Sequence, residues 1–184
     1  MTKTAKHKYN SGIIGNCSYI AHVNNTGNIT WLCWPTFEDS FVFGSLLDQK
    51  DGGEFSILPT SEITNKDQQY IENTNILCTT LTTAEGSYRI TDFAPRFEQY
   101  ERYYKPLMLV RKVEPLEGRP KIRVRCTPKY AYGKEGFSKN RGSNHIQFEQ
   151  EDIKIRLATN MPVSHFFDDI PHVLSSTIYL VMTF

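Results

Sequence analysis

The sequence predicts an all-β fold, an antiparallel β-sandwich, and three observations support this prediction. Short runs in which apolar and polar residues alternate recur along the chain, and this period of two is typical of strands with one buried face. Glycine-containing turn segments separate the runs. Helical periodicity is scarce. A chain of 184 residues can bury the core of one domain, so we expect a single domain over 1–184.

Six runs are expected to be strands. The clearest is "KIRVRCT", in which Ile122, Val124 and Cys126 alternate with basic residues. In the other five, the same alternation or a continuous apolar start indicates a buried face. These runs are 54–59, 87–93, 107–113, 145–149 and 153–158.

Turn segments predict two hairpins. "AEGS" joins 75–83 to 87–93, and "LEGRP" joins 107–113 to 121–127. The final run, 176–184, ends inside an apolar strand pattern without a turn. We expect the sandwich to be incomplete at the C-terminus, with an exposed edge strand that could pair with a second copy in a homo-oligomer.

The only candidate helix is "EDSFVFGSLL" at 38–47. Asp39 or Ser40 could cap it, and Phe43, Leu46 and Leu47 lie three and four residues apart.

Composition excludes several classes of protein. The chain has 21 Lys and Arg against 20 Asp and Glu, which argues against a nucleic-acid partner. No apolar run approaches the roughly 18–20 residues of a membrane span, and the polar segment 1–12 does not resemble a signal peptide. The four cysteines form no metal motif. We expect reduced thiols and a cytoplasmic location.

The sequence contains no identifiable catalytic motif. Phosphate loops, His-Glu-x-x-His and Gly-x-Ser-x-Gly are absent, and adjacent acids such as Glu38 and Asp39 point in different directions. We therefore assign no catalytic residue, no metal and no cofactor. "SHFFDDIPH" at 164–172 gathers two histidines and two aspartates; we favour a solvated loop there over a metal site.

The stretch 27–48 contains both tryptophans and three phenylalanines. Those on the expected strand and helix, including Trp31 and Phe43, are expected to be core. The segment after Cys33 differs, because its proline ends the strand and leaves aromatic rings in a polar-flanked loop. We expect this loop to bind substrate or another domain. Its residues are Trp34, Pro35, Phe37 and Glu38.

Several segments together resemble glycoside hydrolase family 15, the bacterial and archaeal glucoamylase and trehalase-like proteins. Segment 12–48 matches the start of that family's pattern. The matching residues are Ile14, Gly15, Asn16, Ile29, Trp31, Cys33, Pro35, Phe37, Glu38, Val42, Phe43, Leu46, Leu47 and Asp48. Three later segments match in order, and the close resemblance covers residues 9–133. Thr30, Thr36 and Glu38 depart from the common pattern.

The resemblance implies an N-terminal domain of the supersandwich type. In the family, an (α/α)6 barrel C-terminal to this domain carries two catalytic glutamates, and we expect it to be absent here. The chain would then be inactive alone and would support a barrel that hydrolyses α-glucosidic bonds, with the loop from Trp34 to Glu38 at the rim of the sugar pocket.

Two alternatives stay open. The sandwich could be a stand-alone module that binds α-glucan or trehalose through Trp34 and Phe37, or it could be a self-associating structural domain.

Overall fold

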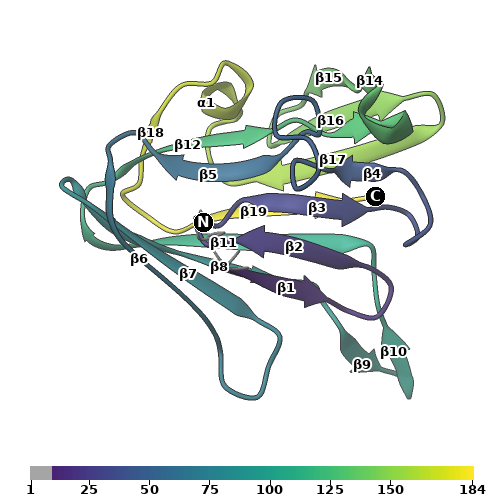
Figure 1. Cartoon of the computed structure of the whole chain (residues 1–184), viewed down its shortest axis with the longest axis horizontal. Coiled ribbons are helices and arrows are strands. Elements are labelled where there is room, and N and C mark those ends of the chain that lie inside the picture. Colours follow the sequence, from purple (N-terminus) through teal and green to yellow (C-terminus); the bar gives the residue numbers. More distant parts are fainter. Residues whose placement is uncertain (1–9) are drawn as a thin grey trace, which may run out of the picture.

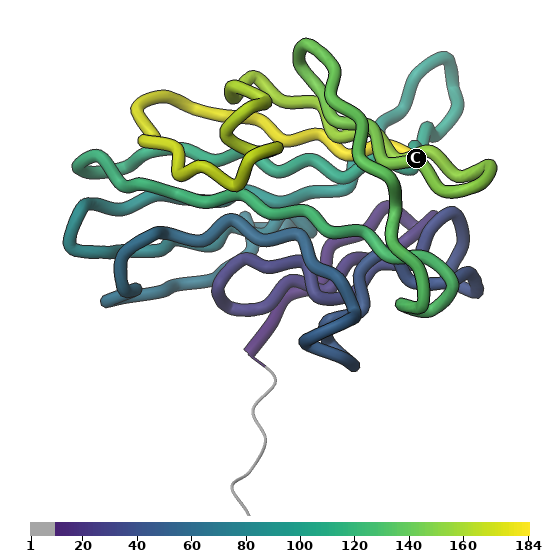
Figure 2. The backbone as a smooth tube through the Cα atoms, turned by 90° about the horizontal axis from the view of Figure 1, so that it is seen from above, coloured from purple at the N-terminus to yellow at the C-terminus, as the bar shows by residue number. Residues whose placement is uncertain are grey.

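The computed structural model describes residues 10–184, which form two large antiparallel sheets facing each other (Figures 1 and 2). The strands of the first sheet are β1 Ser11–Gly15, β2 Ile20–Asn24, β3 Ile29–Cys33, β4 Phe41–Phe43, β5 Phe55–Pro59, β12 Lys121–Cys126 and β18 His172–Val173. Those of the second sheet are β6 Ile63–Tyr70, β7 Leu77–Thr83, β8 Gly86–Phe93, β11 Met108–Gly118, β15 Ser138–Arg141, β16 His145–Gln150, β17 Ile153–Thr159 and β19 Ile178–Thr183.

The order of the first sheet is β1-β2-β3-β5-β12-β18, with β4 also paired to β3. The order of the second is β15-β16-β17-β19-β11-β8-β7-β6. Six small elements lie outside these sheets. They are the paired strands β9 Phe97–Gln99 and β10 Arg102–Tyr104, the paired strands β13 Lys129–Tyr130 and β14 Glu135–Gly136, the 3-10 turn η1 Ala131–Gly133 and the helix α1 Val163–Phe167.

The alternating runs form strands as expected, and their apolar residues face the space between the sheets. In β12, Ile122, Val124 and Cys126 are buried while Lys121 and Arg125 are exposed. The same alternation recurs in β7 and β17. The all-β antiparallel sandwich is thus confirmed.

One expected hairpin is confirmed and the other is wrong. β7 and β8 pair around the turn before Gly86. β11 and β12 do not pair: β11 lies between β8 and β19 in the second sheet, and β12 lies between β5 and β18 in the first. Arg119 donates its backbone N–H to Glu85, so the link stays against the β7–β8 turn before it crosses to the other layer. A period of two cannot reveal this crossing, because strands of either sheet bury the same alternating pattern.

The expected helix at 38–47 is also wrong. Phe41–Phe43 form β4, and Phe43 pairs with Leu32 of β3. The apolar residues do not share a buried face, because Leu46 and Leu47 are exposed while Phe43 is fully buried. Pairing with β3 makes this segment a strand, and the spacing of its apolar residues does not reveal that pairing.

The expected exposed edge at 176–184 is wrong as well. β19 lies inside the second sheet and pairs with β11 on one side and β17 on the other. Its backbone groups are satisfied within the chain, so this strand offers no edge to a second copy.

A buried ion pair within the second sheet also reaches the first sheet through its arginine. Arg111 of β11 and Asp92 of β8 belong to the second sheet, and both side chains are fully buried. The guanidinium group binds Asp92 through Nε at 2.8 Å and Nη2 at 3.1 Å. It also donates to the carbonyl of Phe55 in the first sheet at 2.7 Å and to that of Gly27, and it lies 4.7 Å from the centre of the Phe55 ring. Arg111 therefore links the second sheet to the first by a hydrogen bond to Phe55 and by contact with its ring.

Candidate interaction site at the aromatic end

One end of the sandwich gathers most of the exposed aromatic residues. It is formed by the loops 15–19, 34–40, 94–107 and 127–137 and by the end of β19, all on the right in Figure 1 and again on the right in Figure 2. Seven of the nine exposed aromatic side chains among residues 10–184 belong to these segments. We call the end of the sandwich that carries these seven side chains the aromatic end. They are Phe37, Phe97, Tyr100, Tyr103, Tyr104, Tyr132 and Phe184.

Side-chain contacts tie these loops together. The Asn16 amide donates to the carbonyls of Pro95 at 2.9 Å and Pro106 at 2.8 Å, so the β1–β2 loop holds both ends of the segment that carries β9 and β10. Trp34 packs edge-on against Phe184, with ring centres 6.2 Å apart. The end is therefore a fixed surface assembled from segments distant in the sequence.

The expectation for Trp34 is wrong. Its side chain is only 2% exposed and packs edge-on against Tyr19, with ring centres 5.3 Å apart. The ring belongs to the hydrophobic core and does not face the solvent, so a sugar could not stack on it. Trp34 and Pro35 line a small cavity of about 110 Å³, and the Trp34 Nε1–H has no acceptor among the described residues.

Phe37 and Glu38 do reach the surface, and the loop that carries them is braced. Phe37 is 53% exposed and Glu38 is exposed. Behind them, Asp39 Oδ2 accepts hydrogen bonds from the Thr36 backbone N–H at 2.9 Å and from its hydroxyl at 2.7 Å. Of the four residues expected to form the site, the structure thus presents Phe37 and Glu38, half-buries Pro35 and buries Trp34.

The hairpin formed by β9 and β10 projects from the same end (Figure 1). All its residues from Phe97 to Tyr104 are exposed, and the rings of these two residues stack with centres 5.6 Å apart. The turn places Tyr100 and Glu101 at φ of 52° and 58°. An isolated two-stranded hairpin has little stability of its own in water. Exposed aromatic rings gathered on such a hairpin are typical of a surface that contacts a partner.

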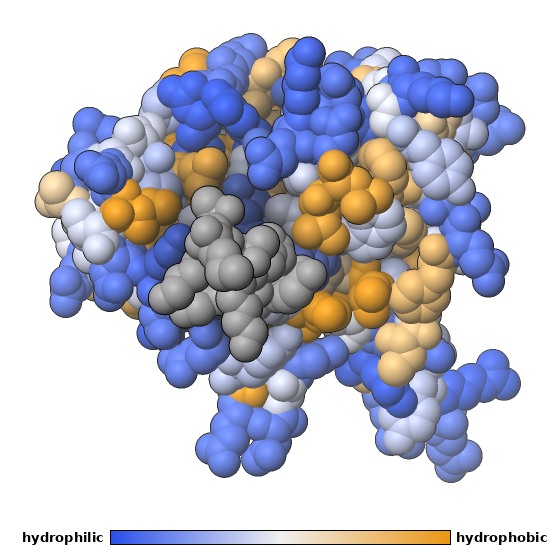
Figure 3. All heavy atoms as spheres, in the orientation of Figure 1, coloured by the Kyte–Doolittle hydropathy of each residue, from blue (hydrophilic) through white to orange (hydrophobic). Residues whose placement is uncertain are grey.

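Apolar side chains also reach the outer face of the first sheet beside this end. Ile13, Ile20 and Leu46 are each between 41% and 52% exposed. Figure 3 shows apolar atoms gathered on the right half of this face. The aromatic end therefore continues onto one side of the sandwich.

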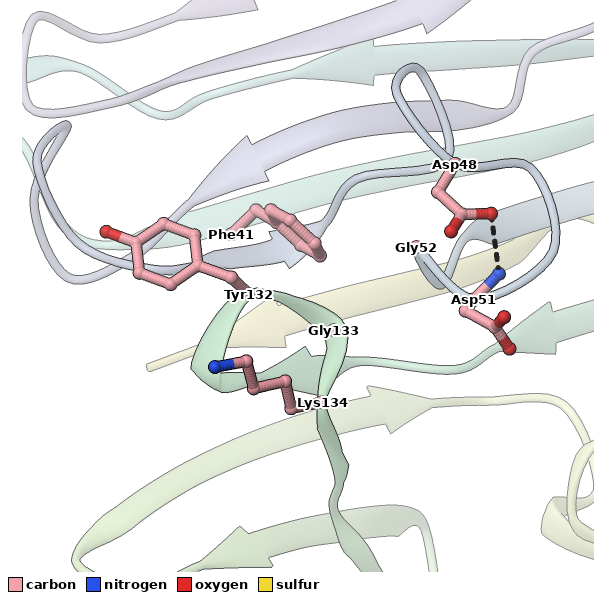
Figure 4. Close-up of a pocket in the computed structure, with 7 residues that line it drawn as sticks. All are labelled: Phe41, Asp48, Asp51, Gly52, Tyr132, Gly133 and Lys134. Atoms are coloured by element: carbon pink, nitrogen blue, oxygen red, sulfur yellow. Dashed lines mark hydrogen bonds between the residues drawn. The ribbon is translucent and has the colours of Figure 1, made fainter.

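A hollow of about 200 Å³ lies between the loop that follows β4 and the turn η1 (Figure 4). Phe41 and Tyr132 form an aromatic wall, with ring centres 6.2 Å apart. Asp48, Asp51 and Lys134 add two carboxylates and an ammonium group. Figure 4 shows Phe41 between the Tyr132 ring and the two aspartates, and the Lys134 side chain points away from both carboxylates.

The loop on one side of the hollow is closed by its own hydrogen bonds. Gly44 donates to the carbonyl of Gly52 at 2.8 Å, and Gly52 donates to that of Asp48 at 2.9 Å. Asp48 Oδ1 accepts the backbone N–H groups of Asp51 and Lys50, and these bonds hold the pKa of Asp48 below its usual value. A Cβ on Gly52 would lie 2.4 Å from the backbone of Gly44, so only glycine fits there.

The opposite side of the hollow is a left-handed turn. Ala131, Tyr132 and Gly133 have φ of 49°, 58° and 86°. For residues other than glycine this conformation costs roughly 1–2 kcal/mol each. The Tyr132 backbone N–H donates to Ser40 Oγ at 2.7 Å, which holds the turn against the loop 34–40. The turn leaves the Tyr132 side chain 67% exposed, so burial does not explain its place.

The histidine and aspartate cluster at 164–172 takes a structural role. Asp169 accepts hydrogen bonds from Arg123 and Arg125 of β12, each at 2.9 Å, and these bonds hold the pKa of Asp169 below its usual value. Part of the segment forms α1. No group of three or more potential metal ligands occurs among residues 10–184.

Sequence reasoning missed Tyr132 and the β9–β10 hairpin. The aromatic density of "FEQYERYY" could have indicated the hairpin. Nothing in "YAYG" announces three consecutive residues with positive φ, because only the last of them is glycine.

The fold and the aromatic end define a β-sandwich domain that gathers exposed aromatic side chains at one end. The family model for the trehalase-like N-terminal domain matches residues 3–166, and the chain belongs to this family. No solved structure gives a significant match. Among residues 10–184, no helix is both long and apolar enough to cross a membrane.

Three curated relatives are trehalases. The chain is 32% identical to the trehalase of Thermoplasma volcanium over 162 residues, which are 86% of this chain and 26% of that protein. It is 33% identical to the trehalase of Thermoplasma acidophilum over 150 residues, which are 78% of this chain and 26% of that protein. It is 42% identical to trehalase 1 of Sulfolobus acidocaldarius over 84 residues, which are 46% of this chain and 14% of that protein. The chain spans about a quarter or less of these relatives.

Proposed function

We propose that the chain is the non-catalytic N-terminal domain of a glycoside hydrolase of family 15, of the trehalase or glucoamylase type, and that its aromatic end packs against the catalytic barrel. The gathering of seven exposed rings at one end of a trehalase-like N-terminal domain is the observation that supports this best. Such a concentration of exposed aromatic side chains is typical of protein interfaces.

Phe37 is the anchor in this proposal. The rings that carry most of the binding energy at interfaces are exposed before binding and held rigidly. Phe37 meets both conditions, because its side chain is 53% exposed and the Thr36–Asp39 hydrogen bonds brace its loop. Glu38, beside the anchor, would lie at the interface and present a carboxylate toward the rim of the sugar pocket.

The chemical steps belong to the barrel. Hydrolysis of an α-glucosidic bond with inversion needs an acid that protonates the leaving oxygen and a base that activates water. In this proposal both carboxyl groups come from the barrel. Asp39, the acid next to Glu38 in the sequence, is already held by Thr36 and is not available as a partner.

The two alternative functions lose part of their basis. A stand-alone α-glucan module was expected to use Trp34 and Phe37, and Trp34 is buried. Self-association was expected through the last strand, and β19 is paired on both sides. The proposal places the protein in the cytoplasm, which agrees with its four free cysteines.

Binding to a catalytic portion tests the proposal. The trehalase of Thermoplasma volcanium, expressed without the quarter that matches this chain, is mixed with the purified chain and analysed by sedimentation and by trehalose hydrolysis. We expect a complex, higher activity of the catalytic portion and no hydrolysis by the chain alone. Phe37→Ala should weaken the complex at least about tenfold.

The matched control is Tyr179→Ala, which removes a ring that is 45% exposed on β19 outside the aromatic end. This variant should bind like the wild type. Hydrolysis by the chain alone, the absence of any complex, or equal losses in the two variants would overturn the proposal.

A further inference from the structure

We propose that Ser11 is a nucleophile for acyl transfer, with His22 as its general base and small carboxylic esters as the class of substrate. The bond concerned is an ester and not a glycosidic bond. The proposal therefore goes beyond the proposed function, in which the catalytic barrel hydrolyses sugars, and does not depend on it.

Three polar side chains form a hydrogen-bonded row across the outer face of the first sheet. Ser11, His22 and Thr30 lie on the neighbouring strands β1, β2 and β3, and all three are half-buried (Figure 1). His22 Nε2 lies 2.8 Å from Ser11 Oγ, and His22 Nδ1 lies 3.0 Å from Thr30 Oγ1. A hydroxyl, an imidazole and a third group that orients the imidazole, each within hydrogen-bond reach of the next, form the arrangement that activates serine nucleophiles.

The hydrogen bonds of Thr30 place the imidazole proton. The Thr30 hydroxyl donates to the backbone carbonyl of His22 at 3.4 Å. A hydroxyl has one proton, so Thr30 Oγ1 accepts the hydrogen bond that it makes with His22 Nδ1. The ring then carries its proton on Nδ1 and leaves the Nε2 lone pair to accept the Ser11 proton. Burial also holds the pKa of His22 below its usual value, which keeps the ring neutral and able to act as a base near pH 7.

A groove beside Ser11 gives a substrate access. Its volume is about 400 Å³, and Ser11, Asn25 and Lys66 are among the residues that line it. Pockets for small molecules begin at roughly 300 Å³, so a whole small ester fits. Acyl transfer develops negative charge on the carbonyl oxygen, and Lys66, which forms no ion pair among residues 10–184, supplies a positive charge on this groove. Because Asp67 lines the groove as well, a neutral ester fits better than an anionic one.

The transfer balances with no reactant besides the ester. Ser11 Oγ forms a bond to the carbonyl carbon while its proton passes to His22 Nε2. The bond between the carbonyl carbon and the leaving oxygen then breaks, and Nε2 returns the proton to that oxygen. The products are an acyl ester of Ser11 and an alcohol. Thr30 is a positioning residue, because it acts through the imidazole and does not touch the ester.

Nuclear magnetic resonance of the ring nitrogens tests the position of the proton. In the ¹⁵N-labelled chain at about pH 8, well above the usual pKa of histidine, the His22 shifts should show a protonated Nδ1 and a bare Nε2. Thr30→Val removes the acceptor of the Nδ1 proton and should give a mixture of the two tautomers. A wild-type ring protonated on Nε2 would overturn the proposal, because that nitrogen could not accept the Ser11 proton.

Acylation by p-nitrophenyl acetate tests the reactivity of Ser11. The full chain is mixed with the ester, and mass spectrometry follows the acylation of each residue with time. We expect acylation at Ser11 in the wild type, and a rate at that residue at least about a hundredfold lower in His22→Gln. A stable ester would make Ser11 a modification site, and release of the acyl group to water would make it a hydrolytic site; both support the proposal.

Two matched controls separate the row from ordinary side chains. Ser61 is another half-buried serine, but its hydroxyl bonds the Glu85 carboxylate and no imidazole, so it should be acylated much more slowly than Ser11. His145 bonds no serine among residues 10–184, so His145→Gln should leave the rate at Ser11 unchanged.

Acylation of Ser11 no faster than that of Ser61 would overturn the proposal, and so would equal rates at Ser11 in His22→Gln and His145→Gln. Circular dichroism checks that the variants fold, and each should melt within about 2 °C of the wild type. If His22→Gln melts lower than this, the tautomer and the comparison of Ser11 with Ser61, both measured on the wild type, decide. Neither experiment involves a trehalase catalytic portion, so the outcome is independent of the docking proposed above.

Discussion

Replacing Arg111 by methionine tests the role of the buried ion pair. The substitution keeps an unbranched side chain of similar reach but leaves the Asp92 carboxylate without its partner in a site that is 0% exposed. The carbonyls of Phe55 in the other sheet and of Gly27 in the β2–β3 turn lose a donor as well. Breaking a fully buried pair on one side costs about 3–5 kcal/mol.

This loss should appear directly in thermal melting. For a domain of this size, 1 kcal/mol corresponds to a change in Tm of about 2–4 °C, so Arg111→Met should lower Tm by about 6–20 °C. Circular dichroism or calorimetry measures the shift. The combined Arg111→Met and Asp92→Leu variant should be more stable than the single variant, because no charge is left buried without a partner.

The deficit of Arg111→Met should also depend on pH. Burial raises the pKa of Asp92, and Arg111 opposes this rise. Without Arg111 the pKa rises further, so the folded variant keeps the proton to a higher pH than the unfolded chain, which releases it near pH 4. Above that pH the unfolded state binds fewer protons, so the variant loses stability as the pH rises through the folded pKa.

Two results would refute this reasoning. One is a single variant that melts within about 2 °C of the wild type, which corresponds to a loss of less than about 1 kcal/mol. The other is a stability deficit that stays constant between about pH 4 and pH 7, since an uncompensated Asp92 must titrate in the folded state.

Further substitutions separate core from surface. Trp34→Ala should cost about 3–5 kcal/mol because it empties a core position, whereas Phe37→Ala should stay within about 0.5 kcal/mol; urea unfolding checks both. Tyr19→Phe should cost about 1–3 kcal/mol, because its buried hydroxyl donates to a backbone carbonyl of the second sheet that would lose its partner. A thiol reagent should modify exposed Cys17 quickly and leave Cys126 unmodified until the chain unfolds, because burial raises the pKa of the Cys126 thiol. Rapid reaction of Cys126 would contradict this.

The strands could be predicted because their signal is local. Ile122, Val124 and Cys126 alternate with solvated residues, and such a pattern needs only one buried face. The assignment of strands to sheets could not be predicted in this way. β11 and β12 follow each other in the sequence and show similar burial patterns. They belong to different sheets because β11 pairs with β19 and β12 pairs with β5, and the sequence of β11 and β12 alone does not indicate these partners.

In the candidate site, too, some features could be predicted from the sequence and others could not. A proline after β3 correctly indicated a loop with an exposed phenylalanine, Phe37. The fate of Trp34 was decided by Tyr19 and Phe184, which are distant in the sequence and surround its ring. The place of Tyr132 depends on positive φ at residues that are not glycine, a conformation that composition does not indicate.

The most direct test of the central claim is hydrogen exchange of the chain with and without a trehalase catalytic portion. We expect the catalytic portion to protect amides in 35–41 and 97–104, at the aromatic end, and to leave the opposite end, including 58–63 and 116–121, unchanged. Protection of the opposite end, or of no segment at all, would contradict the claim that this domain docks through its exposed aromatic rings.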